Sequence, residues 1–165
     1  MRGPRVEVSV RILGRDELAL LDAVAVEVFD GPVDRRWAAE FLADPRHHLA
    51  VAVAEGVVVG MASGVHYVHP DKPPELWVNE VGVAPQHQNR GIGSRLLRAL
   101  FARGRELGCS SAWVGTELDN AAARGLYRAV GGVEEAQPFV MVTFNLIEAR
   151  RAGTGAGDSP DQRDT

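Results

Sequence analysis

The stretch VNEVGVAPQHQNRGIGSRLL, from Val78 to Leu97, decides which fold the chain is expected to adopt. It begins with a β-strand pattern, passes through a polar turn that contains a proline, and continues into the glycine-rich start of a helix. The first amides of a helix have no partner within it, and the helix dipole adds partial positive charge there. Gly91 and Gly93 carry no side chains that would keep a phosphate from the backbone, and Arg90 adds a formal charge. The turn therefore predicts a pyrophosphate-binding site at the start of a helix.

Two familiar phosphate-binding motifs do not fit this turn. A P-loop requires G-x-x-x-x-G-K-[ST], which the sequence lacks, and a dinucleotide fingerprint requires a third glycine or alanine where Leu96 stands. The glycines alone are also compatible with a tight turn and a close contact between helix and sheet. Both interpretations stay open on the glycines alone.

Composition places the chain among ordinary globular proteins. It has 165 residues, of which 45% are hydrophobic and 24% charged, and these values suggest one domain with its own core. The formal net charge of -4 gives no sign of a nucleic-acid partner, and it is compatible with a cationic substrate or simply with solubility. Because the single cysteine, Cys109, excludes an internal disulfide and no apolar run reaches ~18 residues, we expect a cytoplasmic protein without a membrane span.

Hydrophobic periodicity predicts the order of the elements. We expect strands at residues 6–13, 76–83, 110–116 and 139–147, two strands within residues 47–68, a short extra strand near Val133, and helices at residues 16–29, 33–44, 91–107 and 119–130. Glu55-Gly56 is expected to turn the chain between the two strands of 47–68, and Gly131 to end the last helix. This order favours an α/β protein with a mixed sheet covered by helices on both faces. We expect one domain at residues 1–147 and a disordered tail at residues 148–165.

Two motifs carry a resemblance to a known family. Residues Gln88 to Gly93 read QNRGIG and match [RQ]-x-x-G-x-[GA], the acetyl-CoA signature of the GNAT N-acetyltransferases. A second segment, LDNAAARGLYRAVGG from Leu118 to Gly132, is similar to a downstream segment of the same family. The resemblance extends in element order over roughly residues 6–146. It implies the GNAT fold, with a mostly antiparallel sheet of six to seven strands flanked by about four helices, and acetyl-CoA as acetyl donor.

The resemblance also implies site residues. The backbone of Val81 and Val83 would pair with the pantetheine arm, Asn120 would contact the pantetheine or its amide, and Tyr127 would protonate the departing thiolate. The pyrophosphate would lie on the amides of Gln88, Asn89, Arg90, Gly91, Ile92, Gly93 and Ser94. The residues themselves place Tyr127 at the edge of an apolar helix face, so a half-buried packing tyrosine is the alternative.

Acetyl transfer needs a neutral amine, and a free alkylammonium has a pKa of about 10, so a carboxylate or a water relay must accept its proton. Glu80 is the leading candidate, because a carboxylate in an apolar strand is costly to bury unless it is used or paired. Strand alternation predicts Glu80 on the same face as Leu76 and Val78. The alternative for Glu80 is a structural pair with an arginine.

Glu117 is the second candidate, since it ends a predicted strand at the edge where ligands bind in open α/β folds. It could also hold a cationic substrate without taking a proton, or be a solvated loop carboxylate. His47, His48, His66 and His69 have no accompanying cysteine or carboxylate cluster with ligand spacing, so we expect no metal site.

Within the family, the chain is most similar to the small aminoglycoside 3-N-acetyltransferases, which implies a polycationic antibiotic as substrate and a role in resistance. A groove of carboxylates would steer such a substrate, and these are Asp30, Asp34, Glu40, Asp71, Glu75, Glu80 and Glu117. Scattered surface carboxylates are the alternative. A protein, peptide or polyamine acetyltransferase and a CoA-binding sensor without turnover remain open, and a homodimer is expected by analogy with the family.

Overall fold

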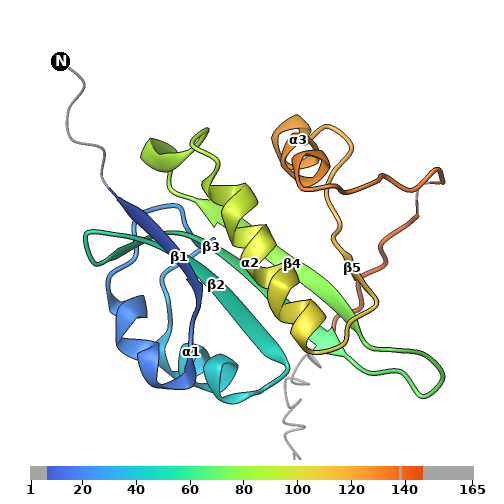
Figure 1. The fold of residues 1–165 in the computed structure, drawn as a ribbon, viewed down its shortest axis with the longest axis horizontal. Helices are drawn as coiled ribbons and strands as arrows, with labels where there is room; N and C mark the ends of the chain where they lie inside the picture. The colour runs from blue at the N-terminus through green and yellow to red at the C-terminus, as the bar shows by residue number, and fades with distance from the viewer. Residues whose placement is uncertain (1–6, 138, 147–165) are drawn as a thin grey trace, which may run out of the picture. The chain divides into compact units, whose positions relative to one another are not determined.

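A five-stranded sheet lies at the centre of the first of two units, as Figure 1 shows. The computed structural model describes residues 7–137 and 139–146. The first unit ends at Val133 and the second begins at Glu134. The strands are β1 (Val8–Ile12), β2 (His47–Ala54), β3 (Val57–Tyr67), β4 (Glu75–Val83) and β5 (Ser111–Trp113). They lie side by side in chain order, antiparallel except for β5, which runs parallel to β4.

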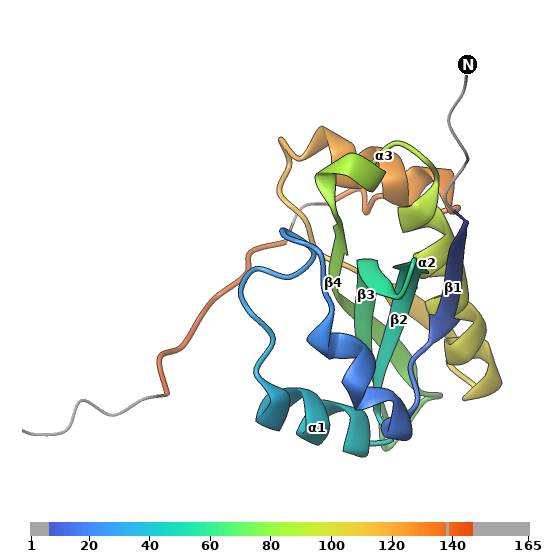
Figure 2. The same cartoon turned by 90° about the vertical axis from the view of Figure 1, so that its left-hand side faces the viewer.

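Helices cover both faces of this sheet (Figure 2). On one face lies α2 (Ile92–Glu106), whose buried Leu96, Leu97 and Leu100 pack on β4 and its neighbours. The 3-10 helix η1 (Arg15–Asp22) and α1 (Arg35–Ala43) cover the other face. The core there consists of Leu13, Leu21, Val28, Leu49, Val51, Val58, Met61 and Ala84. The predicted α/β architecture, with a mixed and mostly antiparallel sheet, is confirmed.

Local signals in the sequence predict most element ends correctly. Glu55 and Gly56 turn between β2 and β3 with φ angles of 50° and 79°, a left-handed pair that suits a two-residue hairpin. Asn120 caps α3 (Ala121–Ala129) by accepting a hydrogen bond from the amide of Ala123 at 3.0 Å, and Gly131 follows α3 with a φ of 94°.

The predicted helix at residues 16–29 is wrong in its second half. The segment forms η1 only to Asp22, and then Val24 bridges to Val58 of β3, whose carbonyl accepts a hydrogen bond from Ala25 at 2.9 Å. The loop that runs along the sheet therefore buries Val28, whereas Val26 of the same apolar pattern stays 79% exposed. Tertiary contacts override the helical periodicity here.

The C-terminal part of the prediction also differs from the structure. Residues 139–146 form no strand, and their side chains from Phe139 to Leu146 are mostly exposed. Val133 lies in no strand either. The described residues thus contain five strands rather than six or seven. An alternating pattern supplies two faces but not the partner strand that a β-strand needs. The predicted tail at 148–165 lies outside the described residues.

The described residues contain no helix with the length and apolar character that crossing a bilayer requires.

Candidate active site

A β-bulge in β4 sets the direction in which Glu80 points. Ser63 of β3 pairs with Glu80 and Gly64 pairs with Val78, so Asn79 is an extra residue on β4. Because side chains alternate along a strand, one extra residue moves every later side chain to the opposite face. The prediction that Glu80 shares a face with Val78 is therefore wrong, and Glu80 faces away from α2.

The loop of residues 23–33 reaches β4 on this second face. Val28 is buried, and its carbonyl oxygen lies 2.0 Å from the place where a Cβ on Gly82 would stand. Only a glycine at position 82 allows such a close approach of the loop to the strand. The crossing brings Asp30 close enough to Glu80 for its charge to act on the Glu80 carboxyl.

Glu80 is half-buried in a partly apolar surrounding. Burial, and next the negative charge of Asp30, raise the pKa of its carboxyl above the ordinary 4.5, while a hydrogen bond from the Asp30 backbone opposes this shift. None of the ion pairs found among residues 7–137 and 139–146 includes Glu80. An unpaired carboxylate with a raised pKa has the properties of a general base more than those of a structural ion pair.

A slot opens between β4 and β5. The two strands pair only from Glu75 with Ser111 to Trp77 with Trp113. Beyond Trp77, the β5 side of β4 has no partner strand in the described part of the chain, and this free edge contains Val81 and Val83. An extended ligand can hydrogen bond to such an edge as an added strand would.

The turn before α2 keeps Gly91 open. Gly91 adopts a φ of 75°, and a Cβ placed there would meet no atom within 4 Å. The first helical hydrogen bond runs from the amide of Arg95 to the Gly91 carbonyl at 3.1 Å, so the amides before Arg95 begin the helix without helical acceptors. This geometry fits the diphosphate of coenzyme A.

Gly93 differs from Gly91. A Cβ on Gly93 would lie 3.1 Å from the Leu126 side chain of α3. Gly93 thus permits a close contact between two helices, whereas the packing interpretation of the glycines expected a contact between helix and sheet. Gln88 donates a side-chain hydrogen bond to the Val83 carbonyl at 2.9 Å, which ties the turn to the end of β4.

Tyr127 and Glu117 form a second group of ionisable residues. Burial, and next the negative charge of Glu117, raise the pKa of Tyr127 above 10.0, so its hydroxyl stays protonated at neutral pH. Tyr127 packs at the edge of the core under α2, whereas Glu80 faces away from that core. Asn120 uses its side-chain oxygen to cap α3. The roles predicted for these residues toward a cofactor stay predictions.

The carboxylates predicted to line one groove have different partners. Asp30 acts on Glu80, whereas Asp34 caps α1 by accepting hydrogen bonds from the amides of Arg36 and Trp37. Glu75 accepts a hydrogen bond from Lys72 at 2.8 Å. The groove of seven carboxylates stays a prediction, and within this set the charge of Asp30 acts on Glu80.

An aromatic cluster beside Glu80 was missed by the sequence analysis. The rings of Trp77 and Trp113 meet edge to face, with centroids 3.9 Å apart and an angle of 79° between their planes. The Trp113 indole donates a hydrogen bond to the Tyr67 hydroxyl at 2.6 Å, which in turn donates to Glu75 at 2.8 Å. The tryptophans are visible in the sequence, but their meeting depends on the parallel pairing of β4 with β5.

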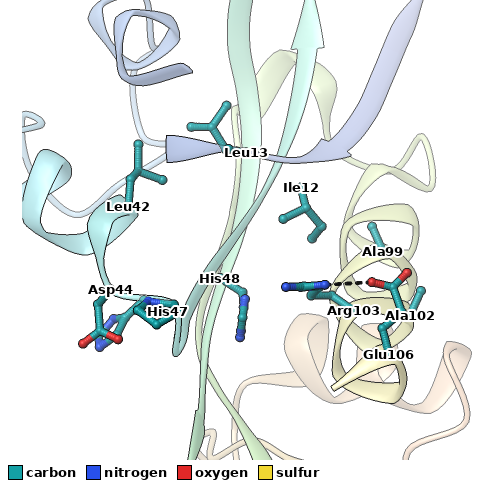
Figure 3. A pocket seen from close by; sticks show the side chains of 12 residues that line it. Ile12, Leu13, Leu42, Asp44, His47, His48, Ala99, Ala102, Arg103 and Glu106 are labelled. Atoms are coloured by element: carbon teal, nitrogen blue, oxygen red, sulfur yellow. Dashed lines mark hydrogen bonds and ion pairs between the residues drawn. The ribbon is translucent and has the colours of Figure 1, made fainter. Parts of the chain in front are cut away.

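A separate cavity of about 580 Å³ lies beyond the end of β1, against the C-terminal half of α2 (Figure 3). Its charged groups have partners already, because Arg103 pairs with Glu106 at 3.0 Å and Asp44 with Arg46 at 2.7 Å. His48, at its edge, forms a 2.9 Å hydrogen bond with His66. Among the described residues, no three histidine, cysteine or acidic side chains gather in a way that could hold a metal ion.

Comparison with known proteins identifies a family and several relatives. The model of the acetyltransferase (GNAT) family matches residues 18–131. The N-alpha-acetyltransferase RimI of Mycobacterium tuberculosis is 42% identical over 92 residues, which are 54% of this chain and 54% of that protein. The L-2,4-diaminobutyric acid acetyltransferase of Nocardia farcinica is 31% identical over 87 residues, 53% of this chain and 44% of that protein. The chain thus matches about half the length of these relatives.

Solved structures share the fold at low sequence identity. An aminoglycoside N-acetyltransferase, AAC(6')-Iy in complex with CoA, has a TM-score of 0.70 at 20% identity and covers 87% of this chain and 99% of its own. A ribosomal-protein-alanine N-acetyltransferase from Brucella melitensis has a TM-score of 0.63 at 17% identity and covers 84% of this chain and 100% of its own. Identities this low show a common fold and carry no argument about the substrate of this chain.

Proposed function

Because this chain belongs to the acetyltransferase (GNAT) family, we propose that it transfers the acetyl group of acetyl-CoA directly to a primary amine. The observation that carries the proposal is the position of Glu80. It lies unpaired beside Asp30, on the strand whose free edge opens next to the Gly91 turn. In this proposal, the acetyl-CoA site and the amine site would therefore adjoin on one strand.

The donor side consists of main-chain groups. The free edge of β4 at Val81 and Val83 would hold the pantetheine arm, and the amides from Gln88 to Ser94 would hold the diphosphate. Acetyl-CoA supplies an activated thioester to this slot. The open, left-handed Gly91 supports this arrangement, because a side chain there would crowd a bound phosphate.

Glu80 would accept the proton of the amine, directly or through water. Its raised pKa brings it closer to the working pH, which suits a general base, and the neutral amine then attacks the thioester carbon while the carbon–sulfur bond breaks. The amides of Val81 and Val83 would polarise the thioester carbonyl. Tyr127, kept protonated by burial and by Glu117, would give a proton to the departing thiolate, and the proton that the attacking nitrogen then loses would restore the Tyr127 hydroxyl. Glu117 then supports Tyr127 rather than the amine.

For the amine, we favour the α-amino group of a peptide or protein. Support comes from the RimI relative, which is named an N-alpha-acetyltransferase and is 42% identical over the matched region. An aminoglycoside is the second candidate, as the motif resemblance predicts, and the closely placed Asp30 and Glu80 would suit a cationic amino sugar. Cytoplasmic location, a homodimer and a role in resistance remain part of these proposals.

A free-thiol assay with acetyl-CoA tests the function. We expect thiol release with short peptides that have a free N-terminus, and none with the same peptides after N-terminal acetylation. Release with gentamicin-type antibiotics but not with peptides would establish the second candidate. Calorimetric binding of acetyl-CoA without thiol release for any peptide, polyamine or aminoglycoside would reject the enzyme and support a sensor.

A further inference from the structure

We propose that Trp77 and Trp113 form an apolar subsite that receives the second side chain of a peptide substrate. The inference rests on the proposed function, because it takes Glu80 as the position of the reacting amine. It predicts that the enzyme prefers peptides whose second residue is large and uncharged.

The register of the sheet places this subsite at a suitable distance. Trp77 pairs with Val65, and Glu80 pairs with Ser63, with a single pair between them. Because the extra residue Asn79 shifts the alternation, Trp77 and Glu80 lie on the same face, two pairs or about 7 Å apart along the strand. An extended peptide advances by about 3.4 Å per residue, so its second side chain reaches the tryptophans when its amine is at Glu80.

The internal hydrogen bonds of the cluster leave it apolar toward a ligand. The Trp113 indole donates to Tyr67 at 2.6 Å, and the Trp77 indole donates to Asn79 at 3.3 Å. Both N–H donors are thus used within the protein. Trp113 remains 43% exposed, so ring surface is what it offers to a substrate.

Glu75, the carboxylate joined to this cluster through Tyr67, already has positively charged and hydrogen-bonding partners. Glu75 accepts hydrogen bonds from Lys72 and Tyr67, each at 2.8 Å, and these hold the pKa of its carboxyl below the usual range. His69 lies 3.4 Å from the same carboxylate. A second positive charge on the substrate would therefore find an aromatic surface without a free counter-ion. The subsite should discriminate against lysine at the second position of a peptide.

The experiment compares three peptides with a free N-terminus and an amidated C-terminus, Ala-Phe, Ala-Gly and Ala-Lys, by thiol release at saturating acetyl-CoA. We expect kcat/KM for Ala-Phe to exceed that for Ala-Gly by about tenfold, and Ala-Lys to be no better than Ala-Gly. Trp113→Ala should remove the preference while the Ala-Gly rate changes by less than about threefold. Trp113→Phe keeps an aromatic ring without the N–H donor and should keep most of the preference.

Trp37→Ala serves as the matched control, because this tryptophan is 65% exposed on α1 and should leave the preference unchanged. Equal kcat/KM values for all three peptides would overturn the subsite while the acetyltransferase function stands. A Trp113→Ala variant that lowers all three rates equally would show that the pair only packs β4 against β5, and would also overturn it.

Binding separates the subsite from the chemistry. Calorimetric titration of Ala-Phe amide and Ala-Gly amide into the protein with bound CoA should give tighter binding of the first, and Trp113→Ala should abolish the difference. Equal affinities would overturn the subsite even if no peptide is acetylated. Absence of thiol release with every amine, together with a preserved difference in affinity, would reject the proposed function alone.

Discussion

The two faces of β4 differ in what they contribute. Toward α2, the strand buries Leu76 and Val78, each 1% exposed, against helix residues that include the fully buried Leu100. On the other face, Glu80 and Trp77 are only half-buried, and Asp30 of the loop of residues 23–33 acts on Glu80. One strand thus serves a closed core on one side and a partly open polar site on the other. The comparison indicates that stability and chemistry can be changed separately.

Glu80→Gln, on the open face of β4, should give the largest effect, a loss of turnover without a loss of stability. Without a proton acceptor, kcat at neutral pH should fall by about 10²–10⁴-fold, while acetyl-CoA affinity and thermal stability stay close to those of the wild type. Steady-state kinetics, calorimetry and a thermal melt check this. Glu7→Gln, an exposed carboxylate before β1, is the control. An unaltered kcat in Glu80→Gln would reject the proton-acceptor role.

Leu100→Ala tests the closed face. Its side chain is fully buried, so truncation should lower the free energy of unfolding by about 2–5 kcal/mol. Urea unfolding measures this loss. Below the unfolding transition, the pH profile of kcat/KM should keep its shape, because the substitution does not touch the Glu80 side. A loss of stability below about 1 kcal/mol would contradict the packing described for this face.

Gly82→Ala connects the two faces through the backbone. Its Cβ would lie 2.0 Å from the Val28 carbonyl oxygen, so the loop that carries Asp30 must move. We expect a loss of about 1–3 kcal/mol in unfolding free energy, together with reduced turnover. Gly31→Ala is the matched control within the same loop, since nothing lies within 4 Å of its added Cβ. Equal behaviour of the two variants would mean that the loop does not depend on Gly82.

Gly91→Ala and Gly108→Ala form a matched pair at the two ends of α2. Both glycines have φ angles near 75° and open space around them, so both variants should lose similar stability, about 1–2 kcal/mol. Only the Gly91 variant should bind acetyl-CoA more weakly, by roughly tenfold or about 1.4 kcal/mol. Calorimetric titration of acetyl-CoA into both variants measures the two affinities. Equal affinities would contradict phosphate binding at the Gly91 turn.

Asp30→Asn should have the smallest effect, on the pH profile. Burial and the Asp30 charge raise the pKa of the Glu80 carboxyl above its ordinary 4.5. Because a general base works only when it is deprotonated, kcat/KM should fall along the acidic limb of its profile as the pH drops through this raised pKa. Removing the like charge lowers that pKa, and the limb should move to lower pH by less than about one unit. Asp71→Asn, an exposed carboxylate in the loop before β4, should leave the limb in place. A shift of the acidic limb to higher pH in Asp30→Asn would contradict a like-charge effect of Asp30 on Glu80.

Sequence reasoning succeeded where the signal lies within a few residues. The turn at Glu55 and Gly56 and the end of the last helix at Gly131 both follow from local backbone chemistry. The family followed from the motif at residues 88–93, and the match over residues 18–131 confirms it. These features need no knowledge of which segments meet in space.

Features that depend on distant segments were misjudged or missed. The segment after Asp22 has a helical pattern, yet contact with Val58 of β3 straightens it into a loop. The contact between Trp77 and Trp113 joins residues that become neighbours only through the pairing of β4 with β5. The amino-acid pattern of a single strand carries no information on such pairings.

By itself, the sequence determined the family and the position of the glycine turn before α2, because helix starts and glycine conformations are set by neighbouring residues. Only the tertiary structure decided on which face of β4 the Glu80 side chain lies and which residues surround it. That decision comes from one unpaired residue, Asn79, in the register between β3 and β4. Register depends on the fit of two whole strands, and a shift of one residue turns side chains from the core face to the opposite face of the sheet.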